Sequence, residues 1–372
     1  MRKILKLLLI ILNALIAVLM LASTLAGVIP PSRTTLFSLL SYGYLYFLIA
    51  NIFFVIVWLL LSSKWFLLSV ATVAIRYAFI PLYFQIGGSD TLKEDINRDE
   101  VLKILTFNAH HFHGVELNSE TGDSNMAFFL KTIDEEQPDA MALQEYIGQS
   151  HSVGLTEQLR QRGYIYMTSG YDNGSITGEV IISKLPILRV VRIEGPAKLY
   201  TELLWGSDTV RLYCLHLNSY GLDESDHQQI HDISHGNMDS LTGRSTLHKF
   251  RETILEHERE WNLLKPYFEN HNHLSVLAAD LNDPPASYFY QQCARFMKDS
   301  YCEAGQGFST TYHGSFTKRE KAIFPAFRID MILHTNDLEA LTYKRIKSEM
   351  SDHYPVVVSL KKKPNNDATP RK

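Results

Sequence analysis

The stretch Ser351-Asp352-His353-Tyr354-Pro355-Val356, close to the end of the chain, places an acid and an imidazole directly before an apolar run. The run from Val356 to Val358 predicts a buried strand. Polar side chains at the end of a buried strand are typical of a hydrolytic site, because a rigid backbone there presents them on irregular loops. An Asp-His pair also occurs in ordinary turns, so it indicates a site only if the other strands end in similar groups.

The 372-residue chain has two parts of very different composition. Residues 1–89 contain no Asp or Glu, and their basic residues are Arg2, Lys3, Lys6, Arg33, Lys64 and Arg76. The other 30 Lys and Arg residues stand against all 40 Asp and Glu residues, so residues 90–372 carry a net charge near −10. We therefore expect an apolar, basic N-terminal segment followed by an acidic globular domain.

Three apolar runs, residues 4–29, 36–61 and 65–84, are each long enough to cross the roughly 30 Å hydrocarbon layer of a membrane. Because backbone groups in lipid need internal hydrogen bonds, we expect three transmembrane helices and a membrane domain over residues 1–89. Alternatively, the first run is a cleaved signal peptide, since basic residues precede it and small residues follow near Ala22. Three crossings with a cytoplasmic N-terminus make this an integral membrane protein whose catalytic domain is extracytoplasmic.

Residues 90–100 are polar and predict a linker, residues 101–361 predict one domain, and residues 362–372 form a polar tail. Within the domain, short apolar runs alternate with amphipathic segments, which is typical of a layered α/β (α+β) fold. We expect helices at residues 124–136, 155–162 and 246–268. We expect strands at residues 101–107, 139–143, 180–183, 187–193, 210–217, 274–279, 328–334 and 355–360.

Polar residues follow or end six of these strands in succession. They are Asn108, Gln144-Glu145, His216 with Asn218, Asp280 with Asn282, Asp330, and Asp352-His353. Together they supply oxygen ligands for Mg²⁺, amide donors for phosphoryl oxygens and an imidazole oriented by a carboxylate. This set suits the attack of water on a phosphoester with the help of a metal ion.

In this order, the motifs Asn108, Gln144-Glu145, His216-Leu217-Asn218, Asp280-Leu281-Asn282, Arg328-Ile329-Asp330 and Ser351-Asp352-His353 resemble those of the endonuclease/exonuclease/phosphatase superfamily. The resemblance covers residues 101–361. It implies the deoxyribonuclease I-like fold, a four-layered sandwich of two packed β-sheets flanked by helices, with the site at one end of the sheets.

The resemblance also implies a role for each matched residue. Glu145 is the principal ligand of Mg²⁺, or of Mn²⁺ as the alternative, with Asn108 and Asp352 near the metal. Asp280 orients or deprotonates the attacking water, and Asn282 and His216 bind the phosphoryl group. His353, held by Asp330, stabilises the pentacovalent state or acts as general base. Apart from what the resemblance implies, we expect Asn218 and His110 to face the substrate.

The chain departs from the family pattern at two places. Ala279-Asp280-Leu281-Asn282 replaces the more usual Gly-Asp-Phe-Asn, which changes packing residues only. His110 stands where many nucleases have an acid, so the metal shell is expected to differ. Beyond the motifs, His227, His231 and His235 are spaced four apart, and residues 219–245 form an insertion that we interpret as a lid beside the site.

Three hypotheses for the function follow. In the first, a membrane-anchored phosphodiesterase or phosphatase acts on a phospholipid or sphingolipid head group, or on another phosphoester near the membrane. In the second, the chain is an extracytoplasmic endonuclease or exonuclease, although an acidic domain favours nucleic acid less as a partner. In the third, it is a catalytically silent binding module. The complete set of catalytic residues argues against the third.

Overall fold

The computed structural model describes residues 2–114, 120–147, 153–168, 177–193, 198–221, 242–269, 273–313, 327–348 and 351–364. His227, His231 and His235 lie outside the described residues, as does most of the insertion expected to form a lid.

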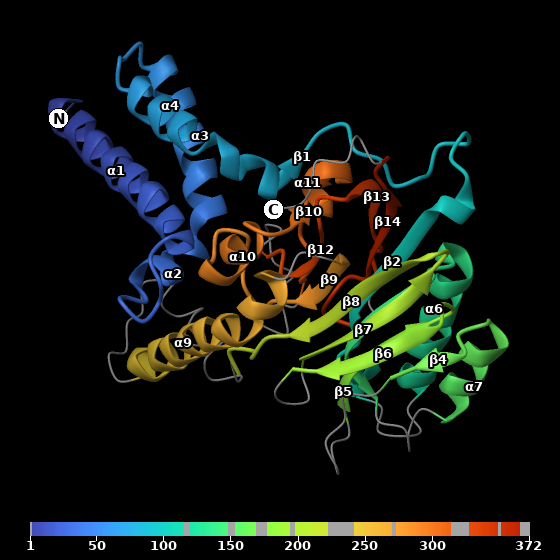
Figure 1. Ribbon diagram of the computed structural model, residues 1–372. Coiled ribbons are helices and arrows are strands. Elements are labelled where there is room, and N and C mark those ends of the chain that lie inside the picture. The colour runs from blue at the N-terminus through green and yellow to red at the C-terminus, as the bar shows by residue number, and fades with distance from the viewer. Residues whose placement is uncertain are drawn as a thin grey trace.

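Two six-stranded sheets form the centre of the molecule (Figure 1). The first has the order β13-β14-β2-β3-β5-β4, and the second has the order β10-β12-β9-β8-β7-β6. Among the strands that the structure describes, only the pairs β2–β3 and β8–β9 of these sheets are parallel. The strands of the first sheet are β13 (Leu338–Arg345), β14 (Val356–Lys362), β2 (Val101–Asn108), β3 (Ala140–Ile147), β5 (Thr177–Ser183) and β4 (Tyr166–Met167). Those of the second are β10 (Lys298–Asp299), β12 (Asp330–His334), β9 (Leu274–Asp280), β8 (Asp208–His216), β7 (Lys198–Trp205) and β6 (Ile187–Arg192).

The sheets pack face to face because alternate residues of each central strand are apolar and buried. In β2, Leu102 and Ile104 face the second sheet, where they share a core with Leu212 and Ala278. The intervening Leu105 and Phe107 belong to a separate core on the outer face. Both faces of each central strand are thus buried, which explains their nearly continuous apolar sequence.

Helices cover the two outer faces and complete four layers. On the first sheet, α6 (Glu120–Glu136) and α7 (Val153–Gln161) contribute residues such as Phe129 and Leu155 to the outer core. On the second, α9 (Thr242–Glu269) and α10 (Tyr288–Cys293) contribute Trp261 and Phe289. The two packed sheets flanked by helices that the sequence predicted are confirmed. Shorter elements are η3 (Arg98–Glu100), α5 (His111–Gly114) and α11 (Ser300–Ala304).

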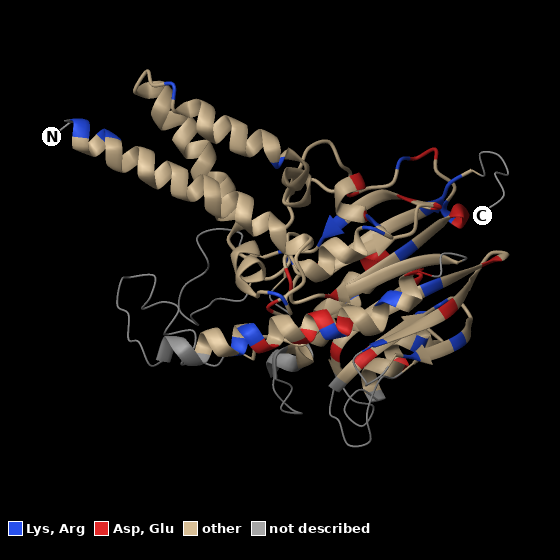
Figure 2. Cartoon of the chain, turned by 60° about the vertical axis from the view of Figure 1, so that its left-hand side comes forward, with Lys and Arg blue, Asp and Glu red and all other residues tan. Residues whose placement is uncertain are grey.

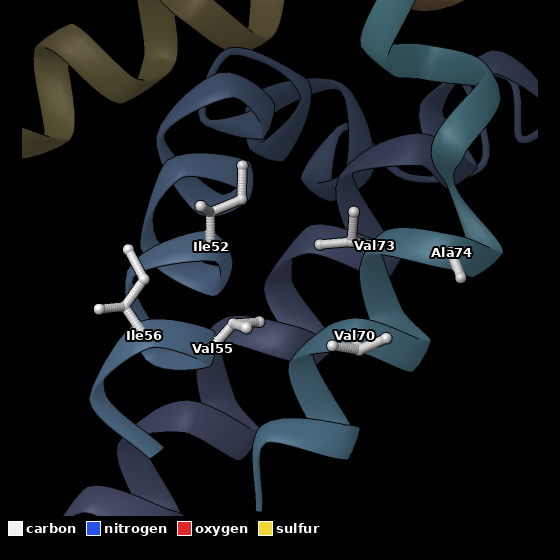
Figure 3. A pocket seen from close by; sticks show the side chains of 6 residues that line it. All are labelled: Ile52, Val55, Ile56, Val70, Val73 and Ala74. Atoms are coloured by element: carbon white, nitrogen blue, oxygen red, sulfur yellow. The ribbon is translucent and has the colours of Figure 1, made fainter. Parts of the chain in front are cut away.

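The N-terminal segment projects from this body as a bundle of apolar helices (Figure 1). Its elements are α1 (Arg2–Ser23), η1 (Thr24–Gly27), α2 (Leu36–Ser41), α3 (Tyr44–Leu60), α4 (Phe66–Ile75), η2 (Tyr77–Leu82) and β1 (Phe84–Gln85). Asn13 in α1 ties the bundle together, since its amide donates to Ser69 in α4 over 2.7 Å and accepts from the Trp58 indole in α3 over 2.9 Å. Between α3 and α4 lies a hollow of about 360 Å³ with only aliphatic lining, formed by Ile52, Val55, Ile56, Val70, Val73 and Ala74 (Figure 3).

The prediction of three spanning helices was wrong. Among the described residues, one helix is long and apolar enough to cross a membrane, the continuous stretch Lys3–Gly27. The second apolar run breaks at Tyr42 and Gly43, which leaves α3 with 17 residues. The third run is α-helical for only 10 residues and continues as the 3₁₀-helix η2, where Pro81 has no N–H for a helical hydrogen bond.

The bundle and the body are held together by polar contacts. Strand β1 pairs antiparallel with β11 (Gly307–Phe308) of the body. The side chain of Gln292 donates to the carbonyl of Gly27 over 2.9 Å, and Ser32 Oγ donates to Glu258 over 2.8 Å. Arg328 is buried, pairs with Asp299 and donates to the carbonyl of Leu82 over 3.0 Å. The N-terminal segment is therefore docked on the body rather than joined only by a loop.

Candidate active site

Strand register brings the expected polar residues together at one end of the two sheets. In the second sheet His216 of β8 lies opposite Asp280 of β9, and Asp280 lies opposite Asp330 of β12. In the first sheet Asn108 ends β2, Glu145 lies in the neighbouring β3, and Asp352 and His353 precede β14. The six central strands thus supply one cluster.

The inner part of this cluster is Asp280, Asp330 and His353, all buried. His353 Nδ1 lies 2.9 Å and 3.0 Å from the two carboxylate oxygens of Asp330 and 3.7 Å from Asp280 Oδ2. Burial alone lowers the pKa of His353, but Asp330 and Asp280 raise it to about 10. Because Nδ1 donates to Asp330, the other ring nitrogen, Nε2, is the one that can meet a substrate.

Both carboxylate oxygens of Asp280 accept hydrogen bonds. Oδ1 accepts from the backbone N–H of Asn282 over 2.9 Å, and Oδ2 accepts from the Asn108 amide over 2.9 Å. Burial raises the pKa of Asp280, and the neighbouring His353 opposes that rise. The hydrogen bonds fix the orientation of this carboxylate.

The outer part of the cluster is half-exposed and consists of acids and histidines. Glu145 accepts from the Asn108 amide over 3.2 Å and lies 3.6 Å from His111 and 3.7 Å from His216. Asp352 pairs with His110 Nδ1 over 3.0 Å. Burial raises the pKa of Asp352, but the hydrogen bond from His110 and the charges of His353 and His110 together more than offset this and leave the pKa below its ordinary value.

Four residues of the site have left-handed backbone angles, with φ of 40° at His110, 50° at His111, 48° at Glu145 and 49° at Asn282. Glu145 lies where the register of β3 against β5 shifts, and such a β-bulge redirects one side chain out of the alternation. Asn282 is held by its N–H bond to Asp280 and by its amide, which donates to the carbonyl of Leu217 over 2.9 Å. Non-glycine residues in this region cost about 1–3 kcal/mol each and cluster at functional sites.

The sequence analysis missed Glu179, a buried acid in β5. Its carboxylate lies 3.3 Å from His216 Nδ1, on the opposite side of the ring from Glu145 and Asp280, which face Nε2. Burial lowers the pKa of His216, but Glu179, Asp280 and Glu145 raise it to about 9. In the sequence, Glu179 is a single acid directly before the apolar residues Val180 to Ile182. The sequence analysis assigned this segment only to a buried strand and gave it no part in the site.

Asn218 and Arg328 make their contacts outside this cluster. Asn218 has an exposed side chain at the rim, and its carbonyl lies 2.8 Å from His257 Nε2. Arg328 of the Arg-Ile-Asp motif bonds Asp299 and Leu82 instead of the cluster. Asn108, Glu145, His216, Asp280, Asn282, Asp330 and His353 are joined by the contacts given above. Asp352 pairs with His110, whose backbone N–H donates to Asn108 Oδ1 over 3.0 Å.

The donor set fits a hard divalent cation. Glu145 and Asp352 offer half-exposed carboxylates, and in the described part of the chain neither pairs with Lys or Arg. The Asn108 amide oxygen accepts one hydrogen bond, from the N–H of His110, and keeps a second lone pair. Asp280, Asp330 and His353 also lie within metal-binding distance of one another. We assign them no metal, because the Nδ1 that faces both acids donates to Asp330.

Comparison with known proteins identifies the family of this chain. Residues 105–353 match the Endonuclease/Exonuclease/phosphatase family, and residues 3–83 match a domain of unknown function. No curated protein matches the chain. Similar solved structures include an endonuclease/exonuclease/phosphatase from Beutenbergia cavernae, with 18% identity, a TM-score of 0.48 and coverage of 71% of this chain and 72% of that one.

Two further similar structures have more specific names. The mannosyl-6-phosphatase of Bacteroides thetaiotaomicron has 17% identity and a TM-score of 0.46, with 70% of this chain and 99% of that chain covered. The D. rerio TDP2 complexed with single strand DNA product has 14% identity and a TM-score of 0.49, with coverage of 70% and 98%. The family match covers most of the chain and contains every residue of the cluster. The chain therefore belongs to the endonuclease/exonuclease/phosphatase family and is a metal-dependent hydrolase that acts on phosphoester bonds.

Proposed function

We propose that the chain is a Mg²⁺-dependent phosphodiesterase or phosphatase anchored in a membrane, with a phospholipid or sphingolipid head group as substrate. The observation that carries this proposal is an apolar helix bundle packed directly on the catalytic body. Along α1 the side chains of Leu5, Leu8, Ile11, Leu15 and Val18 are all more than half exposed. An exposed apolar stripe of this kind is typical of a surface that packs against another apolar surface. We propose that this surface is the hydrocarbon of a lipid bilayer.

The division of the chain that we propose follows composition and contacts. Residues 1–89 form the membrane domain, residues 90–100 connect it, residues 101–361 are catalytic, and residues 362–372 are a tail. Figure 2 shows basic residues at the ends of the bundle helices and charges of both signs over the body. Lys3 and Lys6 lie in the first turns of α1, and Lys64 lies between α3 and α4. Figure 2 shows basic residues at this end of the bundle, away from the body. By the positive-inside rule this end is cytoplasmic, which makes the body extracytoplasmic.

Glu145, Asp352 and Asn108 would hold the metal, which when bound offers positive charge to a phosphoryl oxygen. We propose Mg²⁺ because all three ligands are oxygens, and Mn²⁺ accepts the same donors. The side chains of Glu145 and Asp352 are 26% and 25% exposed, so solvent, and hence a substrate, can reach them.

The remaining roles follow from contacts of the chain's own residues. Hydrogen bonds to both oxygens of Asp280 fix the orientation of its carboxylate. We therefore propose that this carboxylate orients the attacking water. His216 and Asn282 bind the phosphoryl oxygens, and Glu179 keeps His216 charged for that task. His353, oriented by Asp330, offers Nε2 to the pentacovalent state, and His110 and Asn218 lie at the rim toward the rest of the substrate.

A membrane-tethered nuclease is the second candidate, since the family contains nucleases. It is less favoured because a nucleic acid needs Lys and Arg contacts along several phosphates. Within the described residues, every ion pair of the site's acids involves histidine.

The test uses detergent-purified full-length protein and its Asp280→Asn variant. Mg²⁺-dependent product release is measured from sphingomyelin liposomes, phosphoinositide liposomes, a soluble sugar phosphate and plasmid DNA. We expect release from one of the liposomes and a loss of at least a hundredfold in the variant. Cleavage of DNA or of the sugar phosphate with intact liposomes would overturn the lipid assignment, and the bundle would then serve only as an anchor.

A further inference from the structure

Tyr42 lies outside the family match, at the turn between α2 and α3 of the N-terminal segment. Its ring nevertheless packs against aromatic residues of the catalytic body. The ring centroids lie 5.6 Å from Tyr220, 6.0 Å from Phe327 and 6.2 Å from Phe250. Three separate parts of the body therefore hold this ring in place.

The Tyr42 hydroxyl reaches the loop that follows β9. It lies 2.5 Å from Asp283 Oδ1 and 3.3 Å from the carbonyl oxygen of Asn282, and it also bonds the hydroxyl of Tyr220. Tyr220 itself donates to Asp283 Oδ1 over 3.0 Å. Asp283 is buried, so these hydroxyls replace the water that its carboxylate loses.

The same loop is held from a second direction by His257 of α9. Its Nδ1 lies 3.2 Å from Asp283 Oδ2, and its Nε2 lies 2.8 Å from the carbonyl of Asn218. Both ring nitrogens thus face acceptors, an arrangement that suits a doubly protonated ring. His257 ties together the loops after β8 and β9, while Tyr42 is the contact that the N-terminal segment adds.

The position of these contacts matters because Asn282 has a left-handed backbone, with φ of 49°. A conformation of this kind persists only when several contacts enforce it. Two contacts come from within the catalytic body, the N–H bond to Asp280 and the amide bond to Leu217. On its other side, the Asn282 carbonyl and the next residue, Asp283, both face the Tyr42 hydroxyl.

We propose that Tyr42 is a positioning residue of the hydrolase, which fixes the backbone of Asn282 through Asp283 and so completes the active site from the N-terminal segment. The inference rests on the phosphoester hydrolase activity and on the role of Asn282 proposed above, and it is independent of the lipid assignment. It gives the N-terminal segment a part in the chemistry beyond anchoring.

The test compares full-length wild-type protein, Tyr42→Phe and the matched control Tyr46→Phe in detergent. Tyr46 lies one helical turn further on, in α3, and is 40% exposed. The substrate is bis(p-nitrophenyl) phosphate with Mg²⁺, so membrane binding does not enter. We expect Tyr42→Phe to lower kcat about tenfold, because a small displacement of a positioned group is costly. KM should change less than twofold, and Tyr46→Phe should behave as wild type.

A double-mutant cycle separates positioning from general stability. In an Asn282→Ala background, Tyr42→Phe should have little further effect on kcat, because both changes act on one interaction. The same factor in both backgrounds would overturn the proposal, as would an unchanged kcat in Tyr42→Phe alone. If Tyr42→Phe does not fold, Tyr220→Phe removes the other hydroxyl that bonds Tyr42 and Asp283 and spares the His257–Asp283 pair, and the proposal then predicts a loss of kcat in the same direction. A wild type inactive on every substrate would instead contradict the proposed function.

Discussion

The side-chain amide of Asn108 donates a hydrogen bond of 2.9 Å to Asp280 and so joins the central strands of the two sheets at the active site. The same nitrogen lies 3.2 Å from Glu145. One amide thus links the acid that we propose to orient water to the proposed metal ligand, across the boundary between the sheets.

Asn108→Ala should therefore impair both activity and stability. Asp280 is fully buried, and the loss of a donor to a buried charged group costs about 1–3 kcal/mol. We expect a lower thermal midpoint and a fall in kcat of at least a hundredfold, measured by thermal unfolding in detergent and by phosphodiester hydrolysis. A variant with wild-type turnover would show that the bridge between the sheets has no part in catalysis.

Asp330→Asn should impair both catalysis and stability. The amide keeps the shape of Asp330 but removes the charge that faces the buried His353 Nδ1 over 2.9 Å. We expect kcat to fall about a hundredfold or more, together with a lower thermal midpoint, because the variant lacks one partner of a buried pair. Circular dichroism melting serves as the control for folding. Normal turnover in a folded variant would contradict the role given to the Asp330–His353 pair.

Chelation by EDTA should abolish hydrolysis, and added Mg²⁺ should restore it. Glu145→Gln keeps one oxygen ligand without its charge, so half-maximal activity should need at least tenfold more Mg²⁺. Glu135→Gln is the matched control, because Glu135 is an exposed acid of α6 whose ion pair is with Lys131 on the same helix. Equal Mg²⁺ dependence of the two variants would remove Glu145 from the metal site.

The His257–Asp283 pair should make stability depend on pH. Burial lowers the pKa of His257, but Asp283 raises it above its ordinary 6.5. Burial likewise raises the pKa of Asp283, but His257 and the two tyrosines bring it below its ordinary 3.8. The contribution of His257 is complete below pH 6.5 and is lost as pH rises through its folded pKa, whereas that of Asp283 is complete above pH 3.8 and is lost in acid.

Removal of one partner of a buried pair costs roughly 3–5 kcal/mol, so His257→Gln should be clearly less stable than wild type between pH 4.5 and 6. The gap in thermal midpoint between the two proteins should narrow steadily toward pH 9. Melting curves in detergent across this range provide the measurement. A gap that is constant with pH would mean that the histidine is neutral in the folded protein.

The helix bundle should depend on Asn13, whose side chain is fully buried between α1, α3 and α4. Asn13→Ala leaves the Trp58 N–H and the Ser69 hydroxyl without this partner, at a cost of about 1–2 kcal/mol. We expect a lower thermal midpoint for the bundle. Leu12→Ala is the control, because Leu12 is 47% exposed on the outer face of α1 and should have little effect. Equal melting of the two variants would exclude a structural role for the amide.

The central strands were predictable because both of their faces are apolar. The eight expected strands correspond to β2, β3, β5, β6, β8, β9, β12 and β14, with boundaries shifted by a few residues. Strands β7 and β13 were not expected. Strand β7 runs from Lys198 to Trp205 with Thr201 and Glu202 in its middle, so its apolar signal is diluted. Its pairing with β6 and β8 overrides that weak local preference.

The site was predictable for the same reason, since each polar residue stands where an apolar strand ends. The sequence could not show that Glu145 turns at a β-bulge or that Glu179 reaches His216 from β5, because both depend on register between strands far apart in the chain. Nor could it show Tyr42 at Asp283, a contact across 241 positions of sequence. Composition predicted the apolar runs but not their breaks at Gly43 and Arg76.

The contact between Arg328 and the carbonyl of Leu82 affects where a truncated fragment of this enzyme should begin. A soluble fragment begun at residue 101 would keep the buried guanidinium and lose one of its acceptors, and β11 would lose its partner strand β1. A fragment begun near residue 77 retains η2, β1 and both contacts, yet it omits Tyr42. Crystal structures or activities of this fragment would therefore describe a catalytic domain that lacks the contact of Tyr42 with the loop at Asn282 and Asp283.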